Sequence, residues 1–178
     1  MIKKPSHPNL YGTIETETGF MTTIESAHAH IHAGEGFSLS VVFEAVANGA
    51  SVNYCFKTPL ASSGVHVHTQ LVDISATNNK ITAELYEAPT NAPTSGSAIV
   101  AYNRDRNSTA TTKLQSLVSG ATINTTGAAL LNKRIFTSSG TSSFIENIFK
   151  PDTWYIRQFT NGTGSASDIS LFTFWCEY

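Results

Sequence analysis

The sequence predicts an all-β protein, and three observations carry that prediction. Short segments of alternating apolar and polar residues recur along the chain, clusters of Gly, Pro, Asn and Ser separate them, and no long helical pattern is present. In residues 81–87, Ile81, Ala83 and Leu85 fall on one face, a period of two that is typical of a half-buried strand. Many short strands joined by such turns favour a sandwich or a closed barrel, and we expect a jelly-roll-like β-sandwich with an extended N-terminal arm.

Residues 1–20 are predicted to form that arm. Pro5, Pro8 and Gly12 interrupt the segment, and TIETETG alternates threonine with glutamate, so the segment has no apolar face. Because a terminal segment without burial is ordered only when something holds it, we expect the arm to lie on a neighbouring subunit. Residues 21–178 are predicted to form a single β-sandwich domain.

The first half of this domain is predicted to consist of extended segments. Residues 21–32 are expected to be extended, and residues 37–46 carry an alternating apolar face. The Asn-Gly pair at 48–49 is typical of a hairpin turn, so residues 51–58 are expected to pair with the preceding strand. Another strand is expected at 65–75, and residues 81–108 are expected to form a hairpin around a Pro/Ser/Gly turn.

In the second half the pattern leaves some segments open between strand and helix. KLQSLVS (113–119) and ALLNKRIF (129–136) suit either type, while FIENIFKPDTW (144–154) suits a helical turn that Pro151 ends. The last two segments, 154–160 and 168–178, are the most aromatic in the chain. We therefore expect them to form strands at the centre of a sheet.

Composition excludes several classes of protein. The chain has 178 residues, enough for one domain with a sizeable core. Its net charge of −2 and 13% charged residues provide no basic stripe for nucleic acid. No apolar segment is long enough to span a membrane, and the N-terminus lacks the apolar part of a secretory signal. Cys55 and Cys176 lie in predicted strands, which favours buried free thiols over a disulfide in a reducing cytosol.

Histidines are the most distinctive candidates for chemistry. His28, His30 and His32 alternate in one segment, and His66 and His68 in another. On strands, histidines two apart lie on one face, about 6.6 Å from each other. If the two segments are neighbours, three imidazoles can converge on a divalent metal ion in a cupin-like arrangement. The alternative is a polar strand face or a subunit contact, and we expect no bound metal or other cofactor.

No pattern for catalysis is present. The sequence has no Gly-x-Ser-x-Gly nucleophile motif and no phosphate-binding loop. Glu84 and Glu87 lie close together at one strand end, where solvated carboxylates are expected rather than the opposed pair of a glycosidase. The sequence therefore predicts a protein that is not an enzyme.

The segment NRDRNS (103–108) holds two of the four arginines in a chain that is poor in charge. In an extended conformation, Arg104 and Arg106 point to the same side, where guanidinium groups bind carboxylates and carbonyl groups with defined geometry. The predicted interface is formed by Asn103, Arg104, Arg106 and Asn107, together with Lys3, Lys4 and Tyr11 of the arm. The alternative is a local turn in which Asp105 pairs with the arginines while Asn103 and Asn107 cap the backbone.

Four segments of the sequence also resemble a family of tailed-bacteriophage virion proteins. They are HIHAGEGFSLSVVFEAVANGASVNYCFKT, LYEAPT, AYNRDRNS and KPDTWYIRQFTNGTGSASDISLFTFWCEY, which together cover about residues 30–178. The chain is similar to head decoration, or cement, proteins of β-sandwich type. The resemblance implies a dimer or trimer on the capsid surface that bridges subunits of the major capsid protein and is assembled in the bacterial cytoplasm. It carries no catalytic residues.

Two other functions remain open from the sequence. A receptor-binding or glycan-binding sandwich of a phage fibre or tail would expose tryptophan or tyrosine for stacking on sugars, yet Trp154 and Trp175 fall in predicted core strands. A cupin-like metal protein would depend on the histidines. We expect the decoration function, with the major capsid protein and other copies of the chain as partners and neither nucleic acid nor membrane.

Overall fold

The computed structural model describes residues 10–14, 21–60, 65–74, 80–137, 141–143 and 147–177. In chain order the elements are β1 (Leu10–Ile14), β2 (Met21–Glu25), α1 (Ser26–His32), β3 (Gly36–Val46), β4 (Ser51–Lys57), β5 (Val65–Ile74), β6 (Ile81–Glu87), β7 (Ser97–Ala98), β8 (Tyr102–Asn103), β9 (Ser116–Ser119), β10 (Ala129–Phe136), β11 (Thr141–Ser143), β12 (Asn147–Phe149), β13 (Trp154–Asn161) and β14 (Ser167–Glu177).

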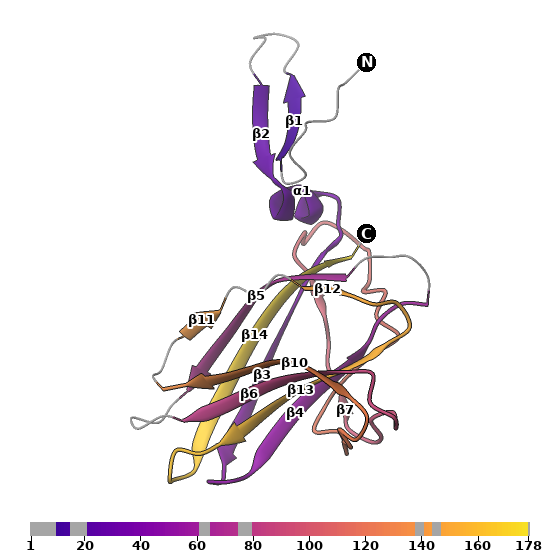
Figure 1. Cartoon of the computed structure of the whole chain (residues 1–178). Helices are drawn as coiled ribbons and strands as arrows, with labels where there is room; N and C mark the ends of the chain where they lie inside the picture. Colours follow the sequence, from indigo (N-terminus) through magenta and orange to yellow (C-terminus); the bar gives the residue numbers. More distant parts are fainter. Residues whose placement is uncertain are drawn as a thin grey trace.

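Two antiparallel sheets pack against each other, which confirms the prediction of an all-β sandwich (Figure 1). The β14 sheet has the strand order β11-β5-β14-β3-β8, and β12 also pairs with β5. The β13 sheet has the order β10-β6-β13-β4-β9-β7. A separate two-stranded sheet is formed by β1 and β2.

The long strands pair in a nested way. β3 pairs with β14, β4 with β13, β5 with β11 and β12, and β6 with β10. The first strand of the sandwich thus pairs with the last and the second with the last but one. The strand pairing is that of one long antiparallel hairpin folded over on itself, so that successive strand pairs lie in opposite sheets.

β13 and β14 lie at the centres of their sheets, as predicted for the two aromatic C-terminal segments. β13 runs between β4 and β6, and β14 runs between β3 and β5. Because each strand is hydrogen-bonded on both sides and covered by the facing sheet, its inward side chains are almost fully buried. Tyr155, Phe159 and Ile169 have no solvent exposure.

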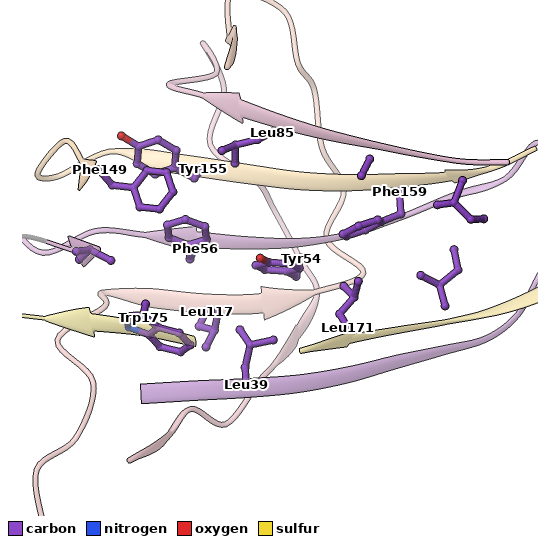
Figure 2. Close-up of a cluster of buried hydrophobic side chains, with 14 of the residues drawn as sticks. Leu39, Tyr54, Phe56, Leu85, Leu117, Phe149, Tyr155, Phe159, Leu171 and Trp175 are labelled. Carbon is purple, nitrogen blue, oxygen red and sulfur yellow. The ribbon is translucent and has the colours of Figure 1, made fainter. Parts of the chain in front are cut away.

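Aromatic and aliphatic side chains fill the space between the sheets (Figure 2). The ring centroids of Phe56 and Tyr155 are 5.2 Å apart, and those of Phe149 and Tyr155 are 4.3 Å apart. Leu171 and Trp175 of β14 complete this core from the opposite sheet. Aromatic pairs at such distances stabilise a fold by about 0.5–1.5 kcal/mol beyond the burial of their area.

β4 is buried on both of its faces. Tyr54 and Phe56 face the core, while Cys55 packs with Ala121 and Ile156 in a second cluster. Asn53 attaches the covering segment, since its Nδ2 donates to the Ala121 carbonyl at 2.9 Å and its Oδ1 accepts from the Ala121 N–H at 3.0 Å. The segment after β9 therefore covers the outer face of the β13 sheet, and β4 lacks a solvated side.

The predicted hairpin at Asn48-Gly49 is wrong, although the turn itself is present. The Ala50 N–H donates to the Ala47 carbonyl at 3.0 Å, and Gly49 has a φ of +81°. β3 and β4, however, belong to different sheets. The turn carries the chain across the sandwich, because each strand finds its hydrogen-bonding partner at the far end of the sequence.

The predicted hairpin within residues 81–108 is also wrong. β6 has the alternating burial that its sequence indicated, but it pairs with β10 and β13. The segment after it breaks into β7, which joins the β13 sheet, and β8, which joins the β14 sheet.

Residues 116–119 and 129–136 are strands rather than helical turns, and residues 147–149 form strand β12.

Residues 21–32 are not continuously extended, contrary to the prediction. β2 is followed by α1, a two-turn helix that contains Ala27 and Ala29, good helix formers. Gly34, at a φ of +74°, ends the helix with a Schellman motif. In that motif the Glu35 N–H donates to the His30 carbonyl, and the Gly34 N–H donates to the Ile31 carbonyl, each at 2.9 Å.

The β1–β2 hairpin stands off one end of the sandwich, with α1 between them (Figure 1). It joins residues on both sides of the boundary expected at residue 20, so part of the predicted arm pairs with the first strand of the predicted domain. Residues 1–9 and 15–20 of the arm lie outside the described residues.

We predict that Asn161→Ala lowers the free energy of unfolding by about 2–3 kcal/mol, as measured by urea denaturation. Asn161 has no solvent exposure, and its Nδ2 donates to the carbonyl groups of Val46 and Ser165 at 2.7 and 2.8 Å. Removing the amide leaves these carbonyls without that donor.

The control is Asn48→Ala, which removes an exposed hydrogen bond to the Gly164 N–H in the adjacent turn. Its cost is expected to be well under that of Asn161→Ala. Equal effects for the two variants would contradict the role assigned to the buried amide.

Candidate binding surface

The outer face of the β14 sheet is unusually aromatic. Along β14 the inward residues Leu171, Thr173 and Trp175 are buried, while Phe172 and Phe174 point outward and are half-buried. The register places these two phenylalanines opposite Ser40 and Ser38 of β3. Because serine is small, the neighbouring strand leaves both rings partly open to solvent.

Two arginines lie over aromatic rings at this face. The Cζ atom of Arg104 is 5.8 Å from the centroid of the Phe172 ring and 5.6 Å from that of the Phe174 ring. The Cζ atom of Arg106 is 5.9 Å from the ring of Tyr102, which is 56% exposed. At exposed sites such cation–π contacts contribute about 0.5–1 kcal/mol, and both arginines remain exposed.

The surface also includes Val42, which is 55% exposed and lies opposite the outward residue Ser170. The aromatic–arginine surface, as we call it, consists of Val42, Tyr102, Arg104, Arg106, Phe172 and Phe174. Aromatic residues and arginine are enriched at protein–protein interfaces, and they supply a disproportionate share of interface hot spots. The composition of this surface therefore fits the binding of another protein.

Asn103 fixes the loop that carries both arginines. It is only 9% exposed, and its Nδ2 donates to the carbonyl groups of Gly34 and Ala110 at 2.8 and 3.2 Å. Its Oδ1 accepts from the Asp105 N–H at 2.9 Å, and Asp105 in turn accepts from the Asn107 N–H at 2.9 Å. These bonds fix the backbone of the loop that carries both arginines.

The structure thus separates the residues predicted for the interface. Arg104, Arg106 and Asn107 are exposed, whereas Asn103 faces inward and positions the loop. The alternative interpretation is correct about the capped turn, but neither arginine forms an ion pair with Asp105 among the described residues. Lys3 and Lys4 lie outside the described residues, and Tyr11 belongs to β1, of which the backbone alone is described.

Sequence reasoning missed the aromatic half of this surface. Phe172 and Phe174 were expected in a core strand, because the C-terminal segment is aromatic throughout. The sequence signal that points to these two residues is the alternation of side chains along the strand. Phe172 and Phe174 lie on the opposite face of the strand from Leu171 and Trp175, so they do not point into the space between the sheets.

His28, His30 and His32 do not point toward one common site. On helix α1, His28 and His32 lie one turn apart, with their Nε2 atoms 2.8 Å from each other and their rings stacked at 4.7 Å. His30 points elsewhere and pairs with Glu35, with Nδ1 and Oε2 at 2.7 Å. His66 and His68 belong to β5, which neighbours β14 and not α1.

The alternative of a histidine metal cluster assumed that both segments are strands, but three of the five histidines lie on a helix. Residues two apart on a helix point in different directions. Within the described part of the chain, no group of three or more His, Cys, Asp or Glu side chains is placed to hold a metal ion.

The carboxylates of β6 were expected to be solvated, and for Glu87 this is wrong. Glu87 is 9% exposed and accepts hydrogen bonds from Lys150 Nζ at 2.6 Å and from the Tyr155 hydroxyl at 2.9 Å. Burial raises the pKa of Glu87, but these two bonds and the charge of Lys150 outweigh that effect and lower it overall. Glu84 is half-buried and pairs with Lys133 at 2.7 Å.

Both cysteines are buried free thiols, as predicted. Burial raises the pKa of Cys55 to about 12, and burial together with the nearby carboxylates of Glu35 and Glu177 raises that of Cys176 to about 12. Thiolates are the reactive form of cysteine. These two side chains therefore act as small core residues.

Comparison with protein-family models, with curated proteins and with solved structures found no match. The described residues contain no helix that is both long and apolar enough to cross a membrane.

We predict that the Glu87 cluster makes stability depend on pH. Because the pKa of Glu87 is lower in the folded chain than in the unfolded chain, its contribution is complete above the unfolded value. The contribution is then lost as the pH falls through the folded value. Urea denaturation from pH 7 down to pH 3 is expected to show a smaller loss of stability for Glu87→Gln than for the natural protein.

A matched control is Glu44→Gln, which removes an exposed carboxylate of β3 outside the cluster. This variant is expected to follow the natural protein across the whole pH range. If Glu87→Gln also follows it, the cluster makes no contribution of this kind.

Proposed function

We propose that this protein is a structural component of a bacteriophage particle, a decoration or cement protein that binds the outside of the capsid and bridges subunits of the major capsid protein. The observation that carries the proposal is the aromatic–arginine surface, an exposed patch whose composition suits protein binding. The resemblance of four sequence segments to phage virion proteins gives the proposal its direction. On this proposal the protein is assembled in the host cytoplasm and has no catalytic role.

The pairing of the strands supports the jelly-roll class for the sandwich. β3, β14, β5 and β11 follow one another in one sheet, and β4, β13, β6 and β10 do so in the other. Eight strands in two interlocked sheets are the architecture of jelly rolls, which occur widely in capsid proteins. Such a fold places its binding surfaces on outer faces and edges, because its interior is filled.

A preformed surface suits a cement protein physically. A protein that binds only the assembled shell stabilises that shell through linkage, since opening the shell also requires these contacts to break. The loop bonds of Asn103 reduce the flexibility that binding would otherwise remove, and less free energy is then lost on association.

One observation favours a second candidate, a glycan-binding protein of a phage fibre or tail. Tyr102 is 56% exposed beside Arg106, and an exposed aromatic ring next to a hydrogen-bond donor is a platform on which a sugar can stack. Trp154 is half-buried and Trp175 is 3% exposed, so neither tryptophan offers a comparable open face.

We predict that Arg104→Ala combined with Arg106→Ala weakens binding to capsids that lack the protein by at least about tenfold, since interface arginines are frequent hot spots. The measurement is cosedimentation with purified heads over a range of protein concentrations, with circular dichroism to show that the fold is unchanged. The natural protein is also expected to raise the temperature at which the heads release their genome.

The matched control is Lys80→Ala combined with Lys113→Ala, which removes two exposed positive charges elsewhere on the chain. Binding of the arginine variant as strong as that of the natural protein would mean that this surface does not contact the capsid. If the natural protein does not bind heads but binds glycans in a screen, the glycan-binding function replaces the decoration function.

We also propose that copies of the chain associate through the edge strand β10. The other three edges of the sandwich end in short strands, β7 and β8 with two residues and β11 with three, whereas β10 has eight. β8 pairs only with Phe37 and Ser38, so β3 is the other long strand at an edge of the described sandwich. Short edge strands are a common protection against unwanted pairing. Leu130 and Ile135 on β10 are each 50% exposed, so this long edge presents both free backbone groups and apolar side chains.

We predict that Ile135→Lys lowers the oligomeric mass measured by light scattering, because a charged side chain disfavours pairing at a strand edge. The control is Ile148→Lys, the same change at a residue of β12 that is 69% exposed. A natural protein that is monomeric, or equal masses for the two variants, would contradict association through β10.

A further inference from the structure

Arg157 is a buried cation at the centre of the sandwich. It lies on β13 between Tyr54 of β4 and Leu85 of β6 in the register, on the face turned toward the β14 sheet. Its side chain is 4% exposed. Arginine is almost never buried to this degree without a charged partner. The groups around its guanidinium therefore have to be identified.

The described residues give Arg157 no acidic partner. It takes part in none of the ion pairs among them, and its Nε–H is buried without an acceptor. Burial lowers the pKa of the guanidinium, and Tyr54 opposes that shift through electrostatic interaction and hydrogen bonding. The hydroxyl of Tyr54 lies 3.3 Å from the hydroxyl of Thr173 on the facing sheet.

The two buried carboxylates of the interior are already engaged. Glu87 accepts from Lys150 and Tyr155. Glu177, which has no solvent exposure, accepts from the Thr112 hydroxyl, the Lys113 N–H and the Trp175 indole. A positive charge held in an apolar core without a counter-charge is strongly unfavourable.

A small cavity adjoins this cation. Its volume is about 20 Å³, and its lining combines Arg157, Tyr54 and Thr173 with apolar side chains, among them Leu39, Leu85 and Trp175. Figure 2 shows Tyr54 and Trp175 directed into the space between the sheets. A cavity needs at least about 10–15 Å³ to hold one water molecule, so this space accommodates one particle of roughly that size.

We propose that this cavity is a binding site for a single monatomic anion of the chloride class, held by the guanidinium of Arg157 together with one O–H donor from the hydrogen-bonded pair of Tyr54 and Thr173. A water molecule can accept a hydrogen bond from Nε–H, but it leaves the positive charge uncompensated. A halide does both, because it accepts hydrogen bonds and carries a full negative charge.

The direct test is diffraction from crystals of the natural protein grown in sodium bromide, with data collected at the bromine absorption edge. The expected result is an anomalous peak in the cavity beside Arg157. Density at that position without a bromine signal means that the cavity holds water, which overturns the proposal. An empty cavity overturns it as well.

A second test measures linkage in solution. Chloride is varied against gluconate, which is too large for the cavity, at constant ionic strength. Once chloride exceeds its dissociation constant, a single site raises the folded-to-unfolded ratio about tenfold for each tenfold increase in chloride. The exposed arginine variant Arg134→Met is expected to keep this dependence, and Arg157→Met is expected to lose it.

A natural protein whose stability is independent of chloride contradicts the proposal, and so does a chloride dependence that survives in Arg157→Met. If Arg157→Met does not fold, the bromide diffraction experiment on the natural protein decides the question. Both measurements are independent of capsid binding, so the outcome is separate from that of the proposed function.

Discussion

The structure depends on the insertion of the last two strands into the centres of the two sheets. β13 separates β4 from β6, and β14 separates β3 from β5. Without them neither sheet is continuous, because β4 and β6 do not pair with each other and neither do β3 and β5. The sandwich therefore closes only when residues near the C-terminus reach strands formed by the first half of the chain. Such non-local pairing makes folding slow compared with folds built from local contacts.

The connections between the strands account for three of the buried polar side chains in the interior. Connections between strands leave backbone groups without strand partners, and buried asparagines bond to some of them. Asn161 bonds to the turn between β13 and β14, and Asn53 bonds to the segment that follows β9. Asn103 bonds to the loop that carries Arg104 and Arg106. Each asparagine offers both donors and an acceptor, which is why a single residue can join two segments. Arg157 differs from these residues, since none of the ion pairs among the described residues involves it.

The same topology decides which surfaces are available for binding. The segment after β9 covers the outer face of the β13 sheet around Cys55 and Ile156. The outer face of the β14 sheet keeps Phe172 and Phe174 half-buried, and Arg104 lies across both rings. The edges of the sheets differ in the same way, because β10 is long and the other edge strands are short. The sandwich therefore has two distinct surface features, an exposed aromatic and basic patch on the β14 sheet and one long edge strand, β10.

The sequence by itself determined the fold class, the two central strands and the buried thiols, because alternation and aromatic content depend on local residue order. It also located Arg104 and Arg106 as interface candidates, since a charge cluster in a chain poor in charge needs no structure to be recognised. Tertiary structure decided the rest. The turn at Asn48-Gly49 has the local chemistry of a hairpin, but strand pairing across the whole chain made it a crossing between sheets. His28, His30 and His32 alternate as on a strand, yet alanine content and the Gly34 cap made them helical. Phe172, Glu87 and Arg157 acquired their roles only from the faces and neighbours that packing gave them, which no short stretch of sequence specifies.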